Sequence, residues 1–199
     1  FIDKTMYIKD IIDNQSKVIL VTRPRRFGKT LNMSMLKYYF DIDQKDNRQL
    51  FDGLKIMQQD EKYTSKLGAY PVIYLTLKDV NDTNYKNMLL NLKTALLSVF
   101  REHRYLLESD KIYEDEKERI KDILFCREDE VALKVAIKEL SEYLYRYFDR
   151  PVILLIDEYD VPIQSAYIND YYDEAINFLK TFYGATFKDN PYLEKTVLT

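Results

Sequence analysis

Residues 19–30 read Ile19-Leu20-Val21-Thr22-Arg23-Pro24-Arg25-Arg26-Phe27-Gly28-Lys29-Thr30, an apolar run that passes into a loop containing proline and glycine. The β-branched and leucine-rich run 17–21 predicts a strand. The segment 31–40 holds good helix formers and no helix breaker, so it predicts a helix that begins directly after the loop. The stretch therefore indicates a strand, a loop and a helix in succession, as in an α/β fold.

Gly28, Lys29 and Thr30 stand at the joint between loop and helix, a position that suits a phosphate group. The first free N–H groups of a helix point toward an anion bound at its N-terminus, and Lys29 adds a positive charge at the β- and γ-phosphates. The Thr30 hydroxyl is placed to hold a magnesium ion. The pattern G-x-x-x-x-G-K-[ST] is matched incompletely, because Arg23 stands where the first glycine is expected. We therefore expect a more open loop than a standard phosphate cradle.

A second motif lies far downstream. Residues 152–158, Val-Ile-Leu-Leu-Ile-Asp-Glu, put two carboxylates directly after five residues of buried type. In an open parallel sheet, ligands gather at the edge formed by the carboxyl ends of the strands, where the loop before Lys29 also emerges. Asp157 is therefore predicted to hold magnesium, usually through water, and Glu158 to orient and deprotonate the attacking water. Taken alone, these residues also suit a polar turn after a strand, but the two motifs together favour a nucleotide site.

Three separated segments resemble one family, namely Phe1-Ile2-Asp3-Lys4-Thr5, Pro24 to Leu31 (Pro-Arg-Arg-Phe-Gly-Lys-Thr-Leu) and Ile156 to Pro162 (Ile-Asp-Glu-Tyr-Asp-Val-Pro). They are similar to the AAA-ATPase-like domain of bacterial and archaeal proteins, whose loop reads Arg-Pro-Arg-Arg-Phe-Gly-Lys-Ser/Thr and likewise lacks the first glycine. The resemblance implies a three-layer αβα P-loop NTPase core of the additional-strand, catalytic-glutamate type, in which the two motif strands are not neighbours. It also implies ATP and Mg²⁺ as cofactors, and members of this family often carry a nuclease-like domain of the PD-(D/E)XK type after the ATPase.

The resemblance includes the whole loop, so the predicted nucleotide-binding residues are Arg23, Pro24, Arg25, Arg26, Phe27, Gly28, Lys29 and Thr30. Arg25 and Arg26 either contact the γ-phosphate or an acidic neighbour such as Asp3, or they are ordinary surface and packing arginines. In the implied architecture the strand after the second motif ends in a polar sensor residue, and Thr199 occupies that place. Thr199 would hydrogen-bond the attacking water or the γ-phosphate; the alternative is that it has no such role.

Strands and helices alternate along the rest of the chain, without a repeat, a low-complexity tract or a linker. The further predicted elements are a helix over 4–12 capped by Asp3, short helical turns over 49–54 and 60–67, a strand over 72–77, a helix over 85–103, a solvated charged helix within 108–130, a helix over 133–147 ended by Pro151, a strand over 152–156, a helix from about 170 to 187 and a strand over 195–199. Near-continuous apolar strands imply a parallel sheet covered on both faces. We expect at least four parallel strands, with the last between the first and the third. We expect residues 1–199 to be one P-loop domain that lacks a final strand and a helical lid.

Composition limits the classes of partner. The 30 basic and 33 acidic residues give a formal net charge of −3, so no overall basic field draws the protein to nucleic acid or to an anionic membrane. A single cysteine, Cys126, excludes an internal disulfide and favours a reducing compartment. The single histidine, His103, continues the apolar stripe of its helix, which favours a histidine at the edge of the core over a metal ligand. No apolar stretch reaches the ~18 residues of a membrane helix and no signal-peptide pattern is present, so we expect a cytoplasmic protein.

Three functions stay open at this point. The first is a magnesium-dependent ATPase whose hydrolysis switches a partner or an effector domain outside this chain. The second is a nucleotide-binding module without turnover, and the third is a nucleic-acid-binding module, which the charge balance opposes. The implied partners are ATP, an effector or nuclease-like domain and a second copy of the chain, with nucleic acid reached only indirectly.

Overall fold

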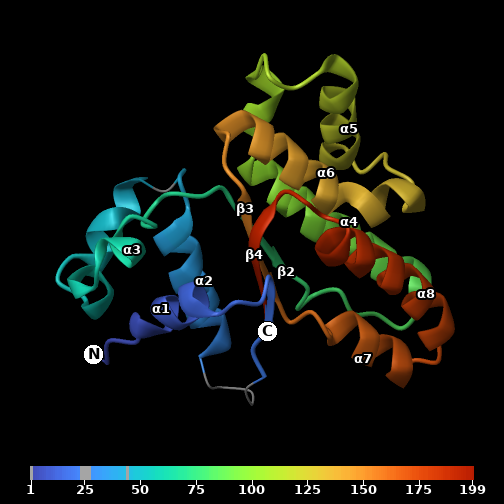
Figure 1. The fold of residues 1–199 in the computed structure, drawn as a ribbon. Coiled ribbons are helices and arrows are strands. Elements are labelled where there is room, and N and C mark those ends of the chain that lie inside the picture. The colour runs from blue at the N-terminus through green and yellow to red at the C-terminus, as the bar shows by residue number, and fades with distance from the viewer. Residues whose placement is uncertain (1, 23–27, 44) are drawn as a thin grey trace.

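The computed structural model describes residues 2–22, 28–43 and 45–199. These residues form an α/β fold in which a parallel sheet lies between two layers of helices (Figure 1). The strands are β1 (Val18–Leu20), β2 (Val72–Thr76), β3 (Val152–Asp157) and β4 (Leu193–Leu198). Their limits differ from the predicted ones by at most two residues, as strand ends commonly do.

The strand order is β1-β4-β3-β2, and every neighbouring pair is parallel. The last strand therefore lies between the first and the third, as predicted, and the strands of the two motifs are not neighbours. Parallel pairing brings all carboxyl ends to one edge of the sheet. The ends of β1, β3 and β4 thus meet at the edge where the loop after β1 and the carboxylates after β3 were expected to act.

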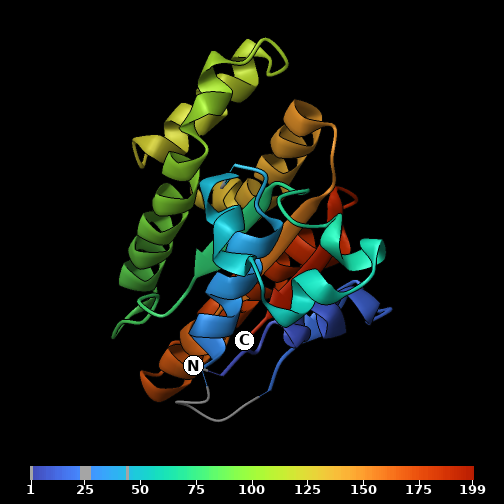
Figure 2. The same ribbon diagram turned by 90° about the vertical axis from the view of Figure 1, so that its left-hand side faces the viewer.

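One helical layer is built from the N-terminal part of the chain (Figure 2). It comprises α1 (Met6–Asp13), α2 (Lys29–Phe40), the 3₁₀ helices η1 (Lys45–Phe51) and η2 (Lys55–Gln58), and α3 (Glu61–Thr64). The helix α2 lies against the sheet because its buried residues, among them Met33 and Leu36, pack with Ile153 and Leu155 of β3.

The other layer is built from the later helices, on the opposite side of the sheet in Figure 1. It comprises α4 (Tyr85–Glu102), the 3₁₀ helix η3 (Arg104–Glu108), α5 (Glu114–Leu124), α6 (Glu130–Phe148), α7 (Val161–Ile168), α8 (Tyr172–Tyr183) and the π-helical segment η4 (Gly184–Lys188). In the described ranges, none of the helices combines the length and the apolar character needed to cross a membrane.

The sheet has two different faces because side chains alternate along each strand. Val152, Leu154 and Ile156 of β3 pack with the α4–α8 layer, whereas Ile153 and Leu155 pack with the α2 layer. All six residues of β3 are buried. By the same alternation Asp157, the last residue of β3, belongs to the face that α2 covers.

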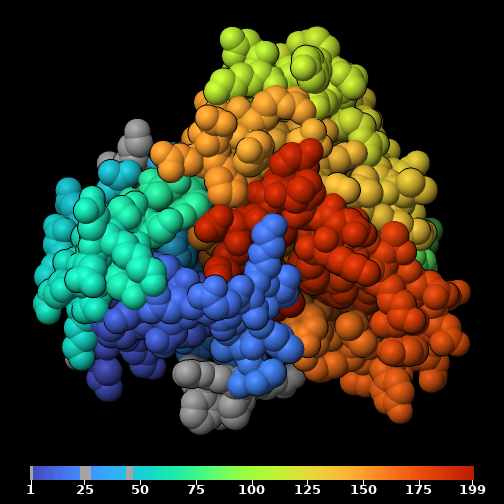
Figure 3. Space-filling view, in the orientation of Figure 1, coloured from blue at the N-terminus to red at the C-terminus, as the bar shows by residue number. Residues whose placement is uncertain are grey.

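The strand β1 departs from the prediction of a sheet covered on both faces. Val18 and Leu20 are 39% and 48% exposed, and Figure 3 shows this segment at the surface beside the C-terminal strand. The physical reason is position: β1 is a three-residue strand at the edge of the sheet, with a neighbour on one side only. An apolar run therefore indicated the strand correctly but not its burial.

Two further local predictions need correction. The first helix begins at Met6, two residues later than predicted, so Asp3 lies outside it and does not cap it. Asp3 instead accepts hydrogen bonds from the backbone N–H groups of Thr5 and Lys55, each at 2.8 Å, and so joins the N-terminal segment to η2. The helix α7 was not predicted, since its residues have no amphipathic pattern and lie directly after the polar motif.

Candidate functional site

Asp157 lies at the carboxyl end of β3, where its side chain is 3% exposed. Its Oδ1 accepts a hydrogen bond from the hydroxyl of Thr199, and its Oδ2 accepts one from the Tyr74 hydroxyl at 3.4 Å. No lysine or arginine of the described ranges forms an ion pair with Asp157. Both side-chain hydrogen bonds to Asp157 thus come from neutral hydroxyl groups, and a carboxylate oxygen can accept more than one bond.

Thr199 reaches Asp157 because β4 runs parallel to β3 and directly beside it. Its backbone N–H donates to the carbonyl of Ile156 at 3.0 Å, and its carbonyl accepts from the backbone N–H of Tyr159 at 3.1 Å. The side chain is 5% exposed. The structure thus brings Thr199 and Asp157, both predicted site residues, into direct contact.

Gly28 and Lys29 form the start of α2. Gly28 is the N-cap and has a left-handed backbone conformation, with φ +74° and ψ +27°. This conformation costs glycine little and other residues more, which explains glycine at the turn from loop into helix. The carbonyl of Gly28 accepts the first helical hydrogen bond, from the N–H of Asn32 at 2.9 Å. Lys29 is half-buried at the helix N-terminus and Thr30 is exposed.

A cavity of about 370 Å³ lies between the start of α2 and the carboxyl ends of the strands. It is lined by Leu20, Val21, Thr22, Lys29, Tyr159, Asp160 and Thr199. Its volume falls within the range of small-molecule sites. Lys29 and Thr199 therefore share one cavity although they stand near opposite ends of the chain, and Asp157 lies directly behind Thr199.

The other predicted site residues take different places. Gly28, Thr30, Asp157 and Glu158 are not among the residues that line this cavity. The predicted loop residues Arg23, Pro24, Arg25, Arg26 and Phe27 lie outside the described residues. The sequence interpretation assigned no role to Thr22, Tyr159 or Asp160, which also line the cavity. Tyr159 and Asp160 were present in the second motif, so the motif itself was the available signal.

Glu158 makes the sharp turn after β3. It is a non-glycine residue with a positive φ of 57°, a conformation that is uncommon and costs energy unless the surroundings hold it. The turn is held by the N–H of Val161, which donates to the Glu158 carbonyl at 3.2 Å, and by the Tyr183 hydroxyl, which donates to the Tyr159 carbonyl at 2.5 Å. Residues in such strained backbone conformations are concentrated at functional sites.

Tyr74 is a site residue that the sequence interpretation missed. It stands on β2 opposite Leu155, and it lies on the face of the sheet that α2 covers. Burial raises the pKa of Tyr74 to about 12, and the negative charge of Asp157 adds to the effect. The phenol is therefore a hydrogen-bond donor at neutral pH. Alternation along 72–77 could not show this by itself, because the face that Tyr74 shares with Asp157 depends on how β2 and β3 pair.

The donor set fits magnesium. This small, hard cation prefers oxygen ligands, is commonly bound through one or two carboxylates and keeps several waters. Asp157 supplies a carboxylate at the strand end and Thr30 a hydroxyl at the helix N-terminus. Within the described ranges no three or more histidine, cysteine, aspartate or glutamate side chains are grouped so that they could hold a metal ion.

His103 follows α4 and lies in the core, 4% exposed, as predicted for a histidine at the core edge. Its Nδ1 lies 3.1 Å from the hydroxyl of Tyr105, which in turn donates to Asp43 at 2.7 Å. Burial, followed by the positive charge of Lys37, lowers the pKa of His103 to about 4. The imidazole is therefore neutral at physiological pH.

The chain was also compared with known proteins. A protein-family model described as "Predicted AAA-ATPase" matches residues 1–199. Neither a curated protein nor a solved structure matches the chain.

Proposed function

Because the chain belongs to the AAA-ATPase-like family, we propose that it binds ATP together with magnesium and hydrolyses it. One observation carries the proposal: Lys29 at the start of α2 and Thr199, whose hydroxyl donates to the buried Asp157, line one cavity on the carboxyl edge of the sheet. The two motifs, far apart in the sequence, thus offer a cationic end and an anionic end at the same place. A triphosphate with a divalent cation needs both.

In this proposal Lys29 and the free N–H groups at the start of α2 bind the β- and γ-phosphates. Thr30 and Asp157 hold the magnesium ion through their oxygens, with water completing the shell. Bound magnesium supplies positive charge to the phosphate oxygens and to the charge that develops during transfer. Arg25 and Arg26 are proposed either as γ-phosphate contacts or as surface arginines.

Glu158 is proposed as the general base, and Thr199 as the residue that hydrogen-bonds the attacking water or the γ-phosphate. Glu158 is half-buried and directly follows Asp157, so both carboxylates stand at the carboxyl end of β3, where the attacking water is proposed to bind. The Thr199 hydroxyl donates to Asp157, and Thr199 is one of the residues that line the cavity. Hydrolysis would then switch a partner or an effector domain outside this chain.

A second candidate is a nucleotide-binding switch without turnover. The observation that favours it is that Glu158 is not among the residues lining the cavity, whereas Lys29 is. Binding without a placed base gives a protein that responds to ATP but does not consume it. Turnover measurements on the wild type and on Glu158→Gln separate the two candidates.

The binding part of the proposal is tested by Lys29→Ala. Lys29 carries the charge proposed to meet the β- and γ-phosphates, so we expect ATP affinity to fall by about 1–3 kcal/mol, the usual worth of a charged hydrogen bond. Calorimetric titration with ATP and magnesium measures the change. The matched control is Lys86→Ala on the exposed face of α4, which should bind ATP as the wild type does. If the Lys29 variant and the wild type bind ATP with equal affinity, the nucleotide site does not lie in this cavity.

A further inference from the structure

Tyr74, on β2, contacts Asp157 at the end of β3 and Lys37 on α2. Its hydroxyl donates to Asp157 Oδ2 at 3.4 Å, and the Nζ atom of Lys37, on α2, lies 5.5 Å from the centroid of its ring. Lys37 also forms an ion pair with Glu102 at the end of α4, with 2.7 Å between the charged atoms. The phenol is thus held on β2 between the helix that begins at Lys29 and the carboxylate of Asp157.

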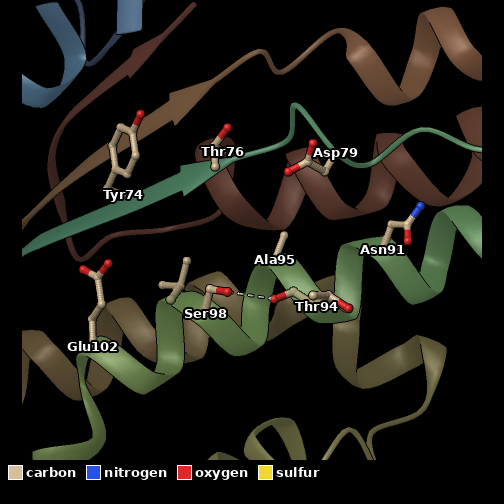
Figure 4. Close-up of a pocket in the computed structure, with 9 residues that line it drawn as sticks. Tyr74, Thr76, Asp79, Asn91, Thr94, Ala95, Ser98 and Glu102 are labelled. Carbon is tan, nitrogen blue, oxygen red and sulfur yellow. Dashed lines mark hydrogen bonds between the residues drawn. The ribbon is translucent and has the colours of Figure 1, made fainter. Parts of the chain in front are cut away.

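A second cavity, of about 290 Å³, adjoins Tyr74 along the free edge of β2. Figure 4 shows the residues of β2 on one side and those of α4 on the other, with the Tyr74 hydroxyl directed away from Glu102 and α4. The cavity is lined by Tyr74, Thr76, Asp79, Asn91, Thr94, Ala95, Ser98, Val99 and Glu102. Tyr74 therefore has space on one side and the Asp157 carboxylate on the other, so its orientation depends on the contacts that it makes rather than on tight packing all round.

The two oxygens of Asp157 are held by different residues. Thr199 of the strand on one side of β3 donates to Oδ1, and Tyr74 of the strand on the other side donates to Oδ2. The last torsion of an aspartate side chain is broad, so a carboxylate with a single partner can rotate about it. Donors on both oxygens disfavour this rotation and so favour one orientation of the carboxylate plane.

We propose that Tyr74 is a positioning residue for Asp157, which orients the carboxylate for the magnesium ion of a bound nucleotide. This inference rests on the proposed function, since it assumes that Asp157 holds magnesium. Hydrogen-bond partners behind a metal ligand commonly change metal affinity 10- to 100-fold when they are removed. At 3.4 Å the contact between the Tyr74 hydroxyl and Asp157 is longer than an ordinary O–H···O hydrogen bond, so its loss should change the stability of the fold little.

The test is Tyr74→Phe, which removes the hydroxyl and keeps the ring beneath Lys37. ATP binding to the whole chain is measured first with a chelator and then over a series of magnesium concentrations, together with the urea midpoint of unfolding. We expect the magnesium concentration for half-maximal ATP binding to rise about 10-fold. ATP affinity without magnesium and the urea midpoint should stay at the wild-type values.

The matched control is Tyr70→Phe. The Tyr70 hydroxyl accepts from Lys66 at 2.7 Å on the same side of the sheet and does not contact Asp157, so its loss should leave the magnesium dependence unchanged. Wild-type magnesium dependence in the Tyr74 variant would overturn the positioning role while leaving the proposed function in place. A Tyr74 variant that loses ATP binding in the chelator as well, or that unfolds earlier, would show a structural role instead. A wild-type chain that binds ATP without any dependence on magnesium would overturn the inference together with the magnesium part of the proposed function.

Discussion

The hydroxyl of Thr199 donates a hydrogen bond to Oδ1 of Asp157, across the boundary between two neighbouring parallel strands. Both side chains are almost fully buried, and Thr199 also lines the cavity that contains Lys29. We therefore expect the loss of this hydrogen bond to lower both the free energy of unfolding and the activity proposed for the site.

Thr199→Val should lower both stability and turnover. Valine keeps the β-branched shape suited to a strand but leaves the buried Asp157 oxygen without this donor, which costs about 1–3 kcal/mol when the partner is charged. Urea unfolding measures the loss. Thr199→Ser restores a hydroxyl at the same position and should recover most of it. A valine variant as stable as the wild type would mean that this hydrogen bond contributes nothing to folding.

Glu158→Gln should separate binding from chemistry. Glutamine keeps the size of the side chain but cannot accept the proton of water, so ATP and magnesium should bind while turnover falls about 10²-fold or more. Phosphate release under single-turnover conditions and calorimetric ATP binding are the two measurements. Asp79→Asn, at an exposed residue after β2, is the control for the loss of one acidic charge. Wild-type turnover in the Glu158 variant would reject its role as base, and a wild-type protein without turnover would favour the non-hydrolysing switch.

Asp41→Asn should stabilise the protein at neutral pH. Burial raises the pKa of Asp41 to about 6 from an ordinary 3.8, so between these pH values Asp41 is ionised in the unfolded state but largely protonated in the folded state. The native fold therefore loses stability as pH rises from about 4 to 6, by up to about 3 kcal/mol for a shift of this size. Asparagine removes that loss and can still accept from the N–H of Asp43. The gain, measured by urea unfolding, should be present at pH 7 and absent below about pH 4; an equal gain at both pH values would refute the assignment.

The pH dependence of stability that comes from His103 should have the opposite sign to that from Asp41. Its pKa is lowered to about 4 in the folded protein, whereas an unfolded histidine takes up a proton near pH 6.5. The unfolded state thus binds more protons between these values, so stability is lost as pH falls from about 6.5 to 4. Because Asp41 changes stability with the opposite sign in much of the same window, the two effects oppose each other in the wild type. His103→Gln should therefore be less sensitive to acid than the wild type, as thermal unfolding at pH 7 and pH 5 would show. A steeper acid loss in the variant would contradict this.

Much of the fold could be predicted because its signals are local. The apolar run before Thr22 and the apolar run before Asp157 predicted two strands, and the breaker-free segment after Thr30 predicted α2. Periodicity likewise indicated α4 and α6 within a few residues. The pairing of segments far apart in the chain leaves no local pattern, so the order of the strands could not be predicted from periodicity. It was implied by the resemblance to the ATPase family, and the structure confirms it. The helix α7 has no amphipathic period and was missed for that reason.

The order of residues along the chain is enough to show glycine and lysine where a loop becomes a helix, and two carboxylates where a buried strand ends. Helix starts and strand ends follow from backbone chemistry within a few residues, so a single chain read in order can show them. The contacts of Thr199 and Tyr74 with opposite oxygens of Asp157, and the exposure of β1 at the edge of the sheet, become visible only in the folded chain. These contacts depend on which strands are neighbours and on the register of their pairing. Strand order and register in turn depend on the free energy of packing the whole sheet between its two helical layers.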